Sequence, residues 1–135
     1  LIALIVMGCR DPNDKLIALE CPEDYYHSQS IRILDQENGI SFFYEPDFGP
    51  EGGAQYVLVE DGDHYYRIYE SLTDKNNDSR WYLLLDRRTL EIWIKGEGRK
   101  NGRKCIKIDV PIEYLDYKKE YPNYKELIDE NKNQI

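Results

Sequence analysis

The clearest fold signal in this chain is the stretch Ser30-Ile-Arg-Ile-Leu-Asp-Gln-Glu-Asn-Gly-Ile-Ser-Phe-Phe-Tyr-Glu45. Its first part, residues 30–36, has isoleucines with the period of two that is typical of a β-strand. Residues 40–45 form a second apolar segment. The pair Asn38-Gly39 between them is a strong hairpin signal, because both central positions of a type I′ turn need a positive φ. The stretch therefore predicts an antiparallel β-hairpin.

The same pattern recurs along the chain, with Asp61-Gly62 as a second turn signal and residues 86–89 as a third turn. The expected strands are residues 30–36, 40–45, 54–60, 64–70, 80–85, 90–95 and 104–110. About seven antiparallel strands in sequential order predict a mainly β fold, a meander that forms a small barrel or sandwich.

Other segments are expected to be loops or helix. Residues 16–26 are expected as an apolar and acidic lead-in to the first strand, and residues 72–79 as a polar loop. Residues 123–132 place apolar side chains on one helical stripe, and Pro122 suits a first helical turn. We therefore expect a short C-terminal helix there; the alternative places another turn before it, at residues 112–119.

The most apolar segment is the N-terminal run Leu-Ile-Ala-Leu-Ile-Val-Met-Gly-Cys9. It has the character of the apolar region of a secretory signal peptide, and it is shorter than the roughly 20 residues that cross a bilayer as a helix. Its last four residues, Val6-Met7-Gly8-Cys9, resemble the lipobox of bacterial lipoproteins, although Met7 is larger than the residue usual at its place. In that family the cysteine is lipidated and becomes the mature N-terminus.

This resemblance implies a domain organisation and a location. Residues 1–8 would be a signal-peptide remnant, residues 9–15 the lipidated cysteine and a polar tether, and residues 16–135 a single β-rich domain. Arg10 rather than Asp follows the cysteine, which in lipoproteins of enteric type implies the outer membrane of the bacterial cell envelope, facing the periplasm. The alternative is that the run is a first β-strand with a buried free cysteine.

The cysteines predict one disulfide. If Cys9 carries lipid, Cys21 and Cys105 remain, and an even pair in an oxidising compartment indicates a disulfide. The alternative is two buried free thiols. Metal binding by these cysteines is disfavoured, because neither has a second cysteine or a histidine at ligand spacing.

The chain is acidic and rich in tyrosine. Its net charge is -8, and it has 12 Tyr against 3 Phe. Binding to nucleic acid is disfavoured, because phosphate contacts demand a basic face. An acidic surface attracts a basic protein partner at long range, although the charge also serves simple solubility. Tyrosine suits half-buried strands and protein interfaces alike.

No motif indicates an enzyme, a metal site or a cofactor. The acidic turn at residues 60–64 lacks the spacing of an EF-hand loop. Residues 96–102 lack the Gly-Lys-Ser/Thr ending of a phosphate-binding loop, and no Gly-x-Ser-x-Gly nucleophile elbow is present. With 26 acidic residues, a pair of carboxylates is expected by chance and carries no specific signal.

Two loops are candidates for binding a partner. Phe48 lies in a loop with acids and glycines, and Asp61, Asp63, His64 and Tyr65 form an acidic and aromatic hairpin tip. Exposed aromatic residues ringed by charge are common at the centre of protein interfaces. The alternative for Phe48 is that it folds back and closes one end of the core.

These observations lead to one functional hypothesis with two alternatives. We expect a non-enzymatic, membrane-anchored lipoprotein that binds another protein, similar in general terms to periplasmic inhibitors and immunity proteins that neutralise cell-wall hydrolases or toxins. The Ser-Gly-Ser-Gly type of stretch found in lysozyme-inhibitor lipoproteins is missing. The alternatives are an assembly accessory of a larger envelope complex, and a carrier that holds a small apolar ligand inside its barrel.

Overall fold

The computed structural model describes residues 15–23, 28–76, 82–96 and 101–122. The lipobox-like tetrad with Cys9, the tether as far as residue 14 and the predicted helix at residues 123–132 lie outside these ranges. No helix among the described residues is long and apolar enough to cross a membrane.

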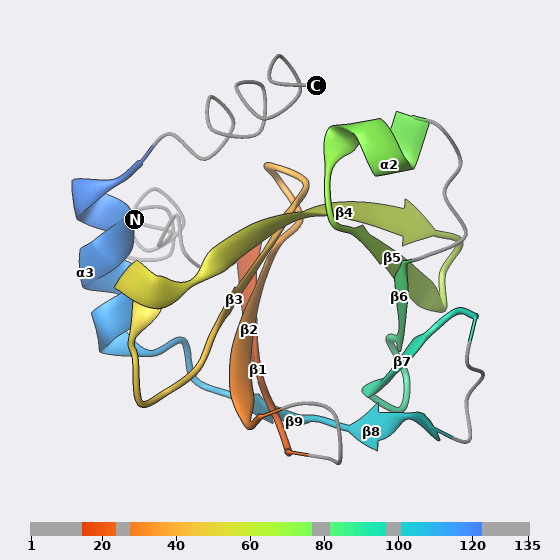
Figure 1. Cartoon of the computed structure of the whole chain (residues 1–135), viewed down its shortest axis with the longest axis horizontal. Coiled ribbons are helices and arrows are strands. Elements are labelled where there is room, and N and C mark those ends of the chain that lie inside the picture. Colours follow the sequence, from red (N-terminus) through yellow and green to blue (C-terminus); the bar gives the residue numbers. More distant parts are fainter. Residues whose placement is uncertain (1–14, 24–27, 77–81, 97–100, 123–135) are drawn as a thin grey trace, which may run out of the picture.

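The described chain forms one antiparallel sheet that curls into a nearly closed barrel (Figure 1). Its nine strands follow the order β8-β7-β6-β5-β4-β3-β2-β1-β9. They are β1 Leu16–Cys21, β2 Ser30–Asp35, β3 Ile40–Tyr44, β4 Ala54–Asp61, β5 Tyr65–Tyr69, β6 Leu83–Asp86, β7 Glu91–Ile94, β8 Arg103–Lys104 and β9 Ile106–Ile108. The prediction of a mainly β meander is confirmed.

The barrel is closed by a single short segment, residues 103–108. Its first part, β8, pairs with β7, and its second part, β9, pairs with β1. Only Cys105 separates the two parts, and its N–H donates to the carbonyl of Leu90 at 2.9 Å. A disulfide joins Cys105 to Cys21, the last residue of β1. The predicted disulfide is therefore confirmed, and it lies at the junction of the two sheet edges.

Both faces of the sheet are covered by apolar side chains. One cluster lines the inside of the barrel, and its buried members are Leu19, Cys21, Leu34, Leu58, Tyr66, Ile68, Leu85, Ile92 and Cys105. The other lies on the outer face and includes Ile33, Phe42 and Val57. Helix α3, Ile112–Glu120, covers this outer cluster with Tyr114, Leu115 and Tyr117.

Three segments differ from the sequence predictions. Residues 16–21 form β1 instead of a lead-in. The sequence pattern did not indicate this strand because its segment, Leu-Ile-Ala-Leu-Glu-Cys, is buried on both faces and shows no alternation. Residues 72–76 form a short helix, α2 (Leu72–Asn76), instead of a loop. Residues 112–120 form the nine-residue helix α3, where the sequence suggested no more than the alternative of another turn.

The hairpins are confirmed, but the turn type predicted for Asn38-Gly39 is wrong. Gly39 and Gly62 have φ of +68°, whereas Leu90 is the sole non-glycine among the described residues with a positive φ, at +64°. Asn38 instead donates its N–H and its side-chain amide to the Asp35 carboxylate. The loop therefore needs glycine at one position only.

The third hairpin is organised by a buried carboxylate. Asp86 accepts hydrogen bonds from the N–H groups of Arg88 and Thr89, and its carbonyl accepts one from the Leu90 N–H at 2.8 Å. Leu90 therefore completes the turn, and β7 begins one residue later than expected.

Candidate partner-binding site

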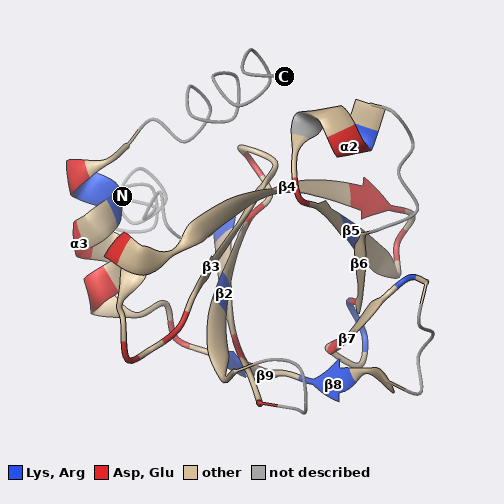
Figure 2. Ribbon diagram, in the orientation of Figure 1, with Lys and Arg blue, Asp and Glu red and all other residues tan. Residues whose placement is uncertain are grey.

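An acidic cleft of about 370 Å³ lies between α3 and the connection from β3 to β4. This acidic cleft is lined by Phe48, Gly49, Pro50, Glu51, Glu113, Asp116, Tyr117 and Glu120. Figure 2 shows acidic residues on α3 and along the facing connection. None of the residues that line the cleft is a lysine or an arginine.

The connection is built so that Phe48 points away from the core. The N–H groups of Phe48 and Gly49 both donate to the carbonyl of Glu45, and Gly49 takes a φ of +70°. Pro50 then starts the 3-10 helix η2, Pro50–Gly52. The Phe48 residue is 72% exposed. The alternative that Phe48 folds back into the core is therefore wrong.

The wall opposite Phe48 is fixed by aromatic packing. Tyr114 of α3 is fully buried, and the rings of Tyr117 and Phe42 lie 5.3 Å apart. The Tyr44 hydroxyl donates to Glu113 Oε1 at 3.1 Å. Burial and the nearby Glu113 carboxylate raise the pKa of Tyr44, so the phenol remains a hydrogen-bond donor at neutral pH. Helix α3 is thus held rigidly against the barrel.

The carboxylates of the cleft give it a negative potential. Glu51 comes from η2, while Glu113, Asp116 and Glu120 have the spacing that places them on one side of α3. Carboxylates beside an exposed aromatic ring suit a lysine or arginine that carries an apolar stem. The chemistry of the cleft therefore suits the side chain of a lysine or an arginine.

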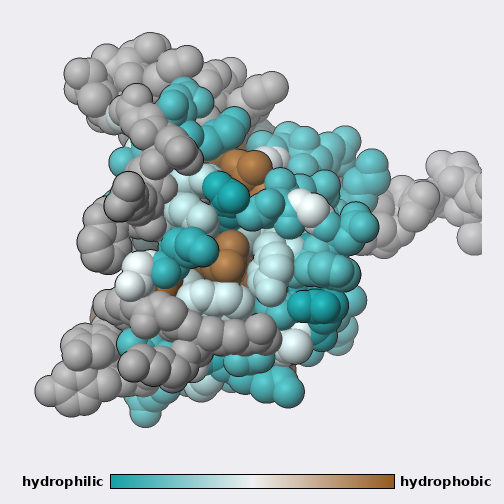
Figure 3. Space-filling view, turned by 90° about the vertical axis from the view of Figure 1, so that its right-hand side faces the viewer, coloured by the Kyte–Doolittle hydropathy of each residue, from teal (hydrophilic) through white to brown (hydrophobic). Residues whose placement is uncertain are grey.

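The hairpin tip contributes less free surface than the sequence suggested. Asp61 accepts a charge-assisted hydrogen bond from Arg67 Nε at 2.7 Å, and the Tyr65 ring packs edge-on against Trp93 at 6.2 Å. Asp63 and His64 are exposed. Figure 3 shows the side of the molecule that carries β5 to β7, and its described surface is mostly hydrophilic with small apolar areas. Two of the four hairpin candidates therefore make contacts within the domain.

Phe48 and the hairpin tip do not form one site. Phe48 precedes β4 and the hairpin follows it, and eight strand residues span about 26 Å. The structure thus brings Asp61, Asp63, His64 and Tyr65 together and leaves Phe48 at the other end of the strand. The sequence reasoning missed the acids of α3. Their spacing at residues 113, 116 and 120 would have indicated one acidic helix face, had this segment been interpreted as a helix.

The site contains no arrangement typical of a metal centre. Within the ranges that the structure describes, no three or more His, Cys, Asp or Glu residues are grouped so that they could hold a metal ion. No protein-family model, curated protein or solved structure matches this chain.

Proposed function

We propose that this chain is an envelope-anchored acidic lipoprotein that acts as a protein-binding module, most specifically an inhibitor or immunity protein against a basic cell-wall hydrolase or toxin. In this proposal the lipid on Cys9 holds the domain at the outer membrane, facing the periplasm. The acidic cleft between α3 and η2 binds a lysine- or arginine-bearing loop of the partner.

The observation that carries the proposal is the exposure of Phe48 beside four carboxylates. A phenylalanine that is 72% exposed on a hydrogen-bonded loop supplies an apolar anchor of low conformational entropy. The residues Glu51, Glu113, Asp116 and Glu120 line the same cleft as Phe48. Interfaces of this kind gain affinity from the central aromatic residue and gain specificity and association rate from complementary charge.

The test is a binding experiment with charge-matched variants. The bait is the whole chain with Cys9→Ser and with the Cys21–Cys105 disulfide oxidised. It is presented to a basic lysozyme, as a model cell-wall hydrolase, and to periplasmic and secreted bacterial extracts. The cleft variant is Asp116→Lys with Glu120→Lys, whose side chains are both exposed.

Two further variants change the net charge by the same amount at other exposed positions. The hairpin variant is Glu60→Lys with Asp63→Lys, and the remote control is Glu37→Lys with Glu70→Lys. Long-range attraction therefore weakens equally in all three variants. The proposal expects a basic hydrolase or toxin that binds at moderate salt, with an affinity at least tenfold weaker for the cleft variant than for the other two.

Equal weakening in all three variants would contradict a binding site in the cleft, because it would show a general charge effect. Loss confined to the hairpin variant would assign binding to the β4–β5 tip instead. Capture of a host envelope complex, without a basic hydrolase or toxin, would favour the assembly-accessory alternative.

A further inference from the structure

The Phe48 ring is held in a fixed position beside the acidic cleft, and its faces are open. The residue is 72% exposed, and within the described ranges no other ring and no cation packs against it. The N–H groups of Phe48 and Gly49 share the Glu45 carbonyl, and the Gly53 N–H donates to the carbonyl of Pro50 at 3.0 Å. The ring is therefore a preorganised aromatic surface that a partner can contact.

The two walls of the cleft are close enough to act on one bound cation. Burial raises the pKa of Tyr117 on α3, and the Tyr121 phenol and the Glu51 carboxylate raise it further. The Glu51 carboxylate on η2 therefore lies within electrostatic range of the opposite wall. That wall contributes Glu113, Asp116 and Glu120, and the cleft between the walls has a volume of about 370 Å³.

The domain itself contains an arginine that contacts a ring and a carboxylate at the same time. The Arg67 guanidinium carbon lies 5.1 Å from the Tyr82 ring centroid, while its Nε donates to Asp61 Oδ2 at 2.7 Å. A guanidinium can make both contacts because its donors point outward in its plane and its flat face is weakly hydrated. The ammonium of lysine is a compact, strongly hydrated charge, so it has no flat face to stack on a ring.

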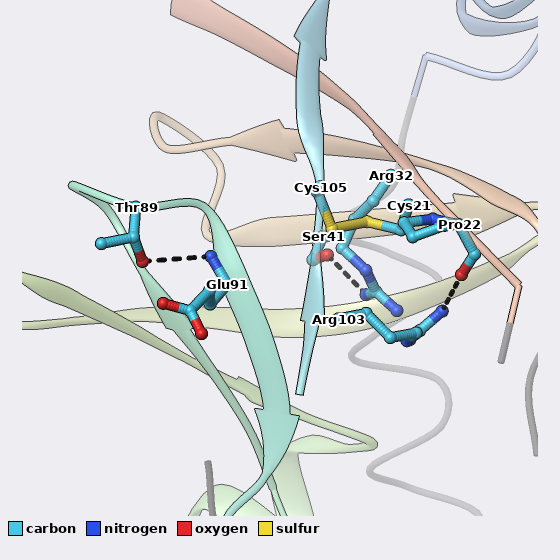
Figure 4. The surroundings of a disulfide bond; sticks show 8 residues. All are labelled: Cys21, Pro22, Arg32, Ser41, Thr89, Glu91, Arg103 and Cys105. Carbon is cyan, nitrogen blue, oxygen red and sulfur yellow. Dashed lines mark hydrogen bonds between the residues drawn. A yellow bond between two sulfur atoms is a disulfide. The ribbon is translucent and has the colours of Figure 1, made fainter. Parts of the chain in front are cut away.

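Arg32 repeats this arrangement with a hydroxyl in place of the carboxylate. Its guanidinium carbon lies 5.2 Å from the Phe43 ring centroid and 5.3 Å from that of Tyr56. Its Nη1 donates to Ser41 Oγ at 2.9 Å (Figure 4). Arg32 is 3% exposed, so ring stacking combined with in-plane hydrogen bonds holds a guanidinium even where water is excluded.

We infer that the acidic cleft selects an arginine over a lysine side chain of the partner protein, and that Phe48 is the residue that sets this preference. The inference rests on the proposed function, because it concerns the same cleft. The guanidinium stacks on the Phe48 ring and donates from its plane to carboxylates of η2 and α3. A lysine in the same place keeps the charge attraction and loses the stacking. The partner surface that fits this cleft is a basic loop with arginine at its centre.

Two capped seven-residue peptides test the inference, one with three arginines separated by glycines and one with three lysines in the same places. Each is titrated at constant ionic strength into the oxidised, ¹⁵N-labelled whole chain with Cys9→Ser, and amide chemical shifts give both the affinity and the location of binding. Phe48→Leu removes the ring and keeps an apolar side chain, whereas Phe48→Trp keeps an aromatic face. The control is Tyr65→Leu, which removes a half-buried ring at the hairpin tip.

The arginine peptide should bind about 2- to 5-fold more tightly than the lysine peptide to the parent protein and to Tyr65→Leu. The preference should be at least as large in Phe48→Trp. In Phe48→Leu the two peptides should bind equally, because only the charge attraction remains. In each case the largest shifts should come from residues that line the cleft.

Three outcomes would overturn the inference. Equal affinities of the two peptides for the parent protein, with both peptides lost in Asp116→Lys with Glu120→Lys, would refute the arginine preference and leave the proposed function intact. An arginine preference that persists in Phe48→Leu would refute the role of Phe48. Shifts confined to residues outside the cleft would contradict both the inference and the proposed binding site.

Discussion

Replacing both Cys21 and Cys105 by alanine should lower the free energy of unfolding by about 4–5 kcal/mol. The two cysteines are 84 residues apart in sequence, and in the chain-entropy model a cross-link over such a loop removes about 4.6 kcal/mol of denatured-state entropy at 25 °C. Domains of this size have a total stability of about 5–15 kcal/mol. The unlinked domain should therefore be marginal, with a melting temperature lower by about 15–20 °C.

Urea unfolding followed by circular dichroism measures this effect in three proteins: the oxidised chain, the alanine pair and the wild-type chain held reduced. The reduced wild type keeps both buried sulfur atoms, so it separates the cross-link from the packing that alanine removes. The two unlinked proteins should agree within about 1.5 kcal/mol, because two small cavities contribute no more than that.

The dependence of the unfolding free energy on urea gives a second readout. A cross-linked denatured chain is more compact, so the m-value should rise when the disulfide is removed. A loss of less than about 1 kcal/mol in the reduced wild type would refute the reasoning. A large loss with an unchanged m-value would also refute it, since the disulfide would then act through the native state.

Three further perturbations follow from single residues. Burial raises the pKa of Asp86, but hydrogen bonds from Arg88 and Thr89 prevail and lower this pKa to about 2. The ionised Asp86 carboxylate therefore stabilises the fold above about pH 4, and this contribution is lost as the pH falls through about 2. Asp86→Asn should therefore flatten the urea-measured stability between pH 4 and pH 2 and cost about 1–3 kcal/mol at pH 7. Gly53→Ala should lower the free energy of unfolding by at least about 1–3 kcal/mol, because the alanine Cβ would lie 2.6 Å from the Phe43 carbonyl oxygen. Gly52→Ala is the control, and equal melting temperatures for the two variants would contradict the steric argument. Phe48→Ser should leave the melting temperature within about 2 °C, because the side chain is exposed, and a larger drop would show that the ring packs in solution.

The sequence predicts the hairpins well because their signals are local. Alternation and turn residues act over a few positions, and Gly39 and Gly62 take the positive φ that a tight connection needs. The turn type was harder to predict, since the Asp35 carboxylate holds Asn38 in a different conformation. The disulfide was also predictable, because the lipobox resemblance set Cys9 aside and left Cys21 and Cys105 as one pair, which needs no knowledge of the fold.

What the sequence could not predict depends on contacts made after the sheet curls. Strand β1 shows no alternation of apolar and polar residues because both of its sides are buried. One side belongs to the outer cluster, which α3 covers, and the other side faces the barrel interior. The burial of Arg32 was unpredictable for the same reason. In an open sheet the face that carries Ser30, Arg32 and Leu34 would be open to water, and closure of the barrel turns that face inward. The acidic cleft, likewise, exists only because α3 packs against η2.

The pairing of residues 103–108 with both β7 and β1 also determines which part of the sheet can form last. Strands β1 to β7 each pair with their neighbours in sequence, so they can add one after another as a growing meander. The second partner of β1 is different, because Ala18 pairs with Ile108 near the end of the described chain. Until that segment is in place, both β1 and β7 present open hydrogen-bonding edges, which are templates for pairing with another chain. A late, non-local closing step of this kind slows folding and exposes the unfinished barrel to strand exchange between molecules.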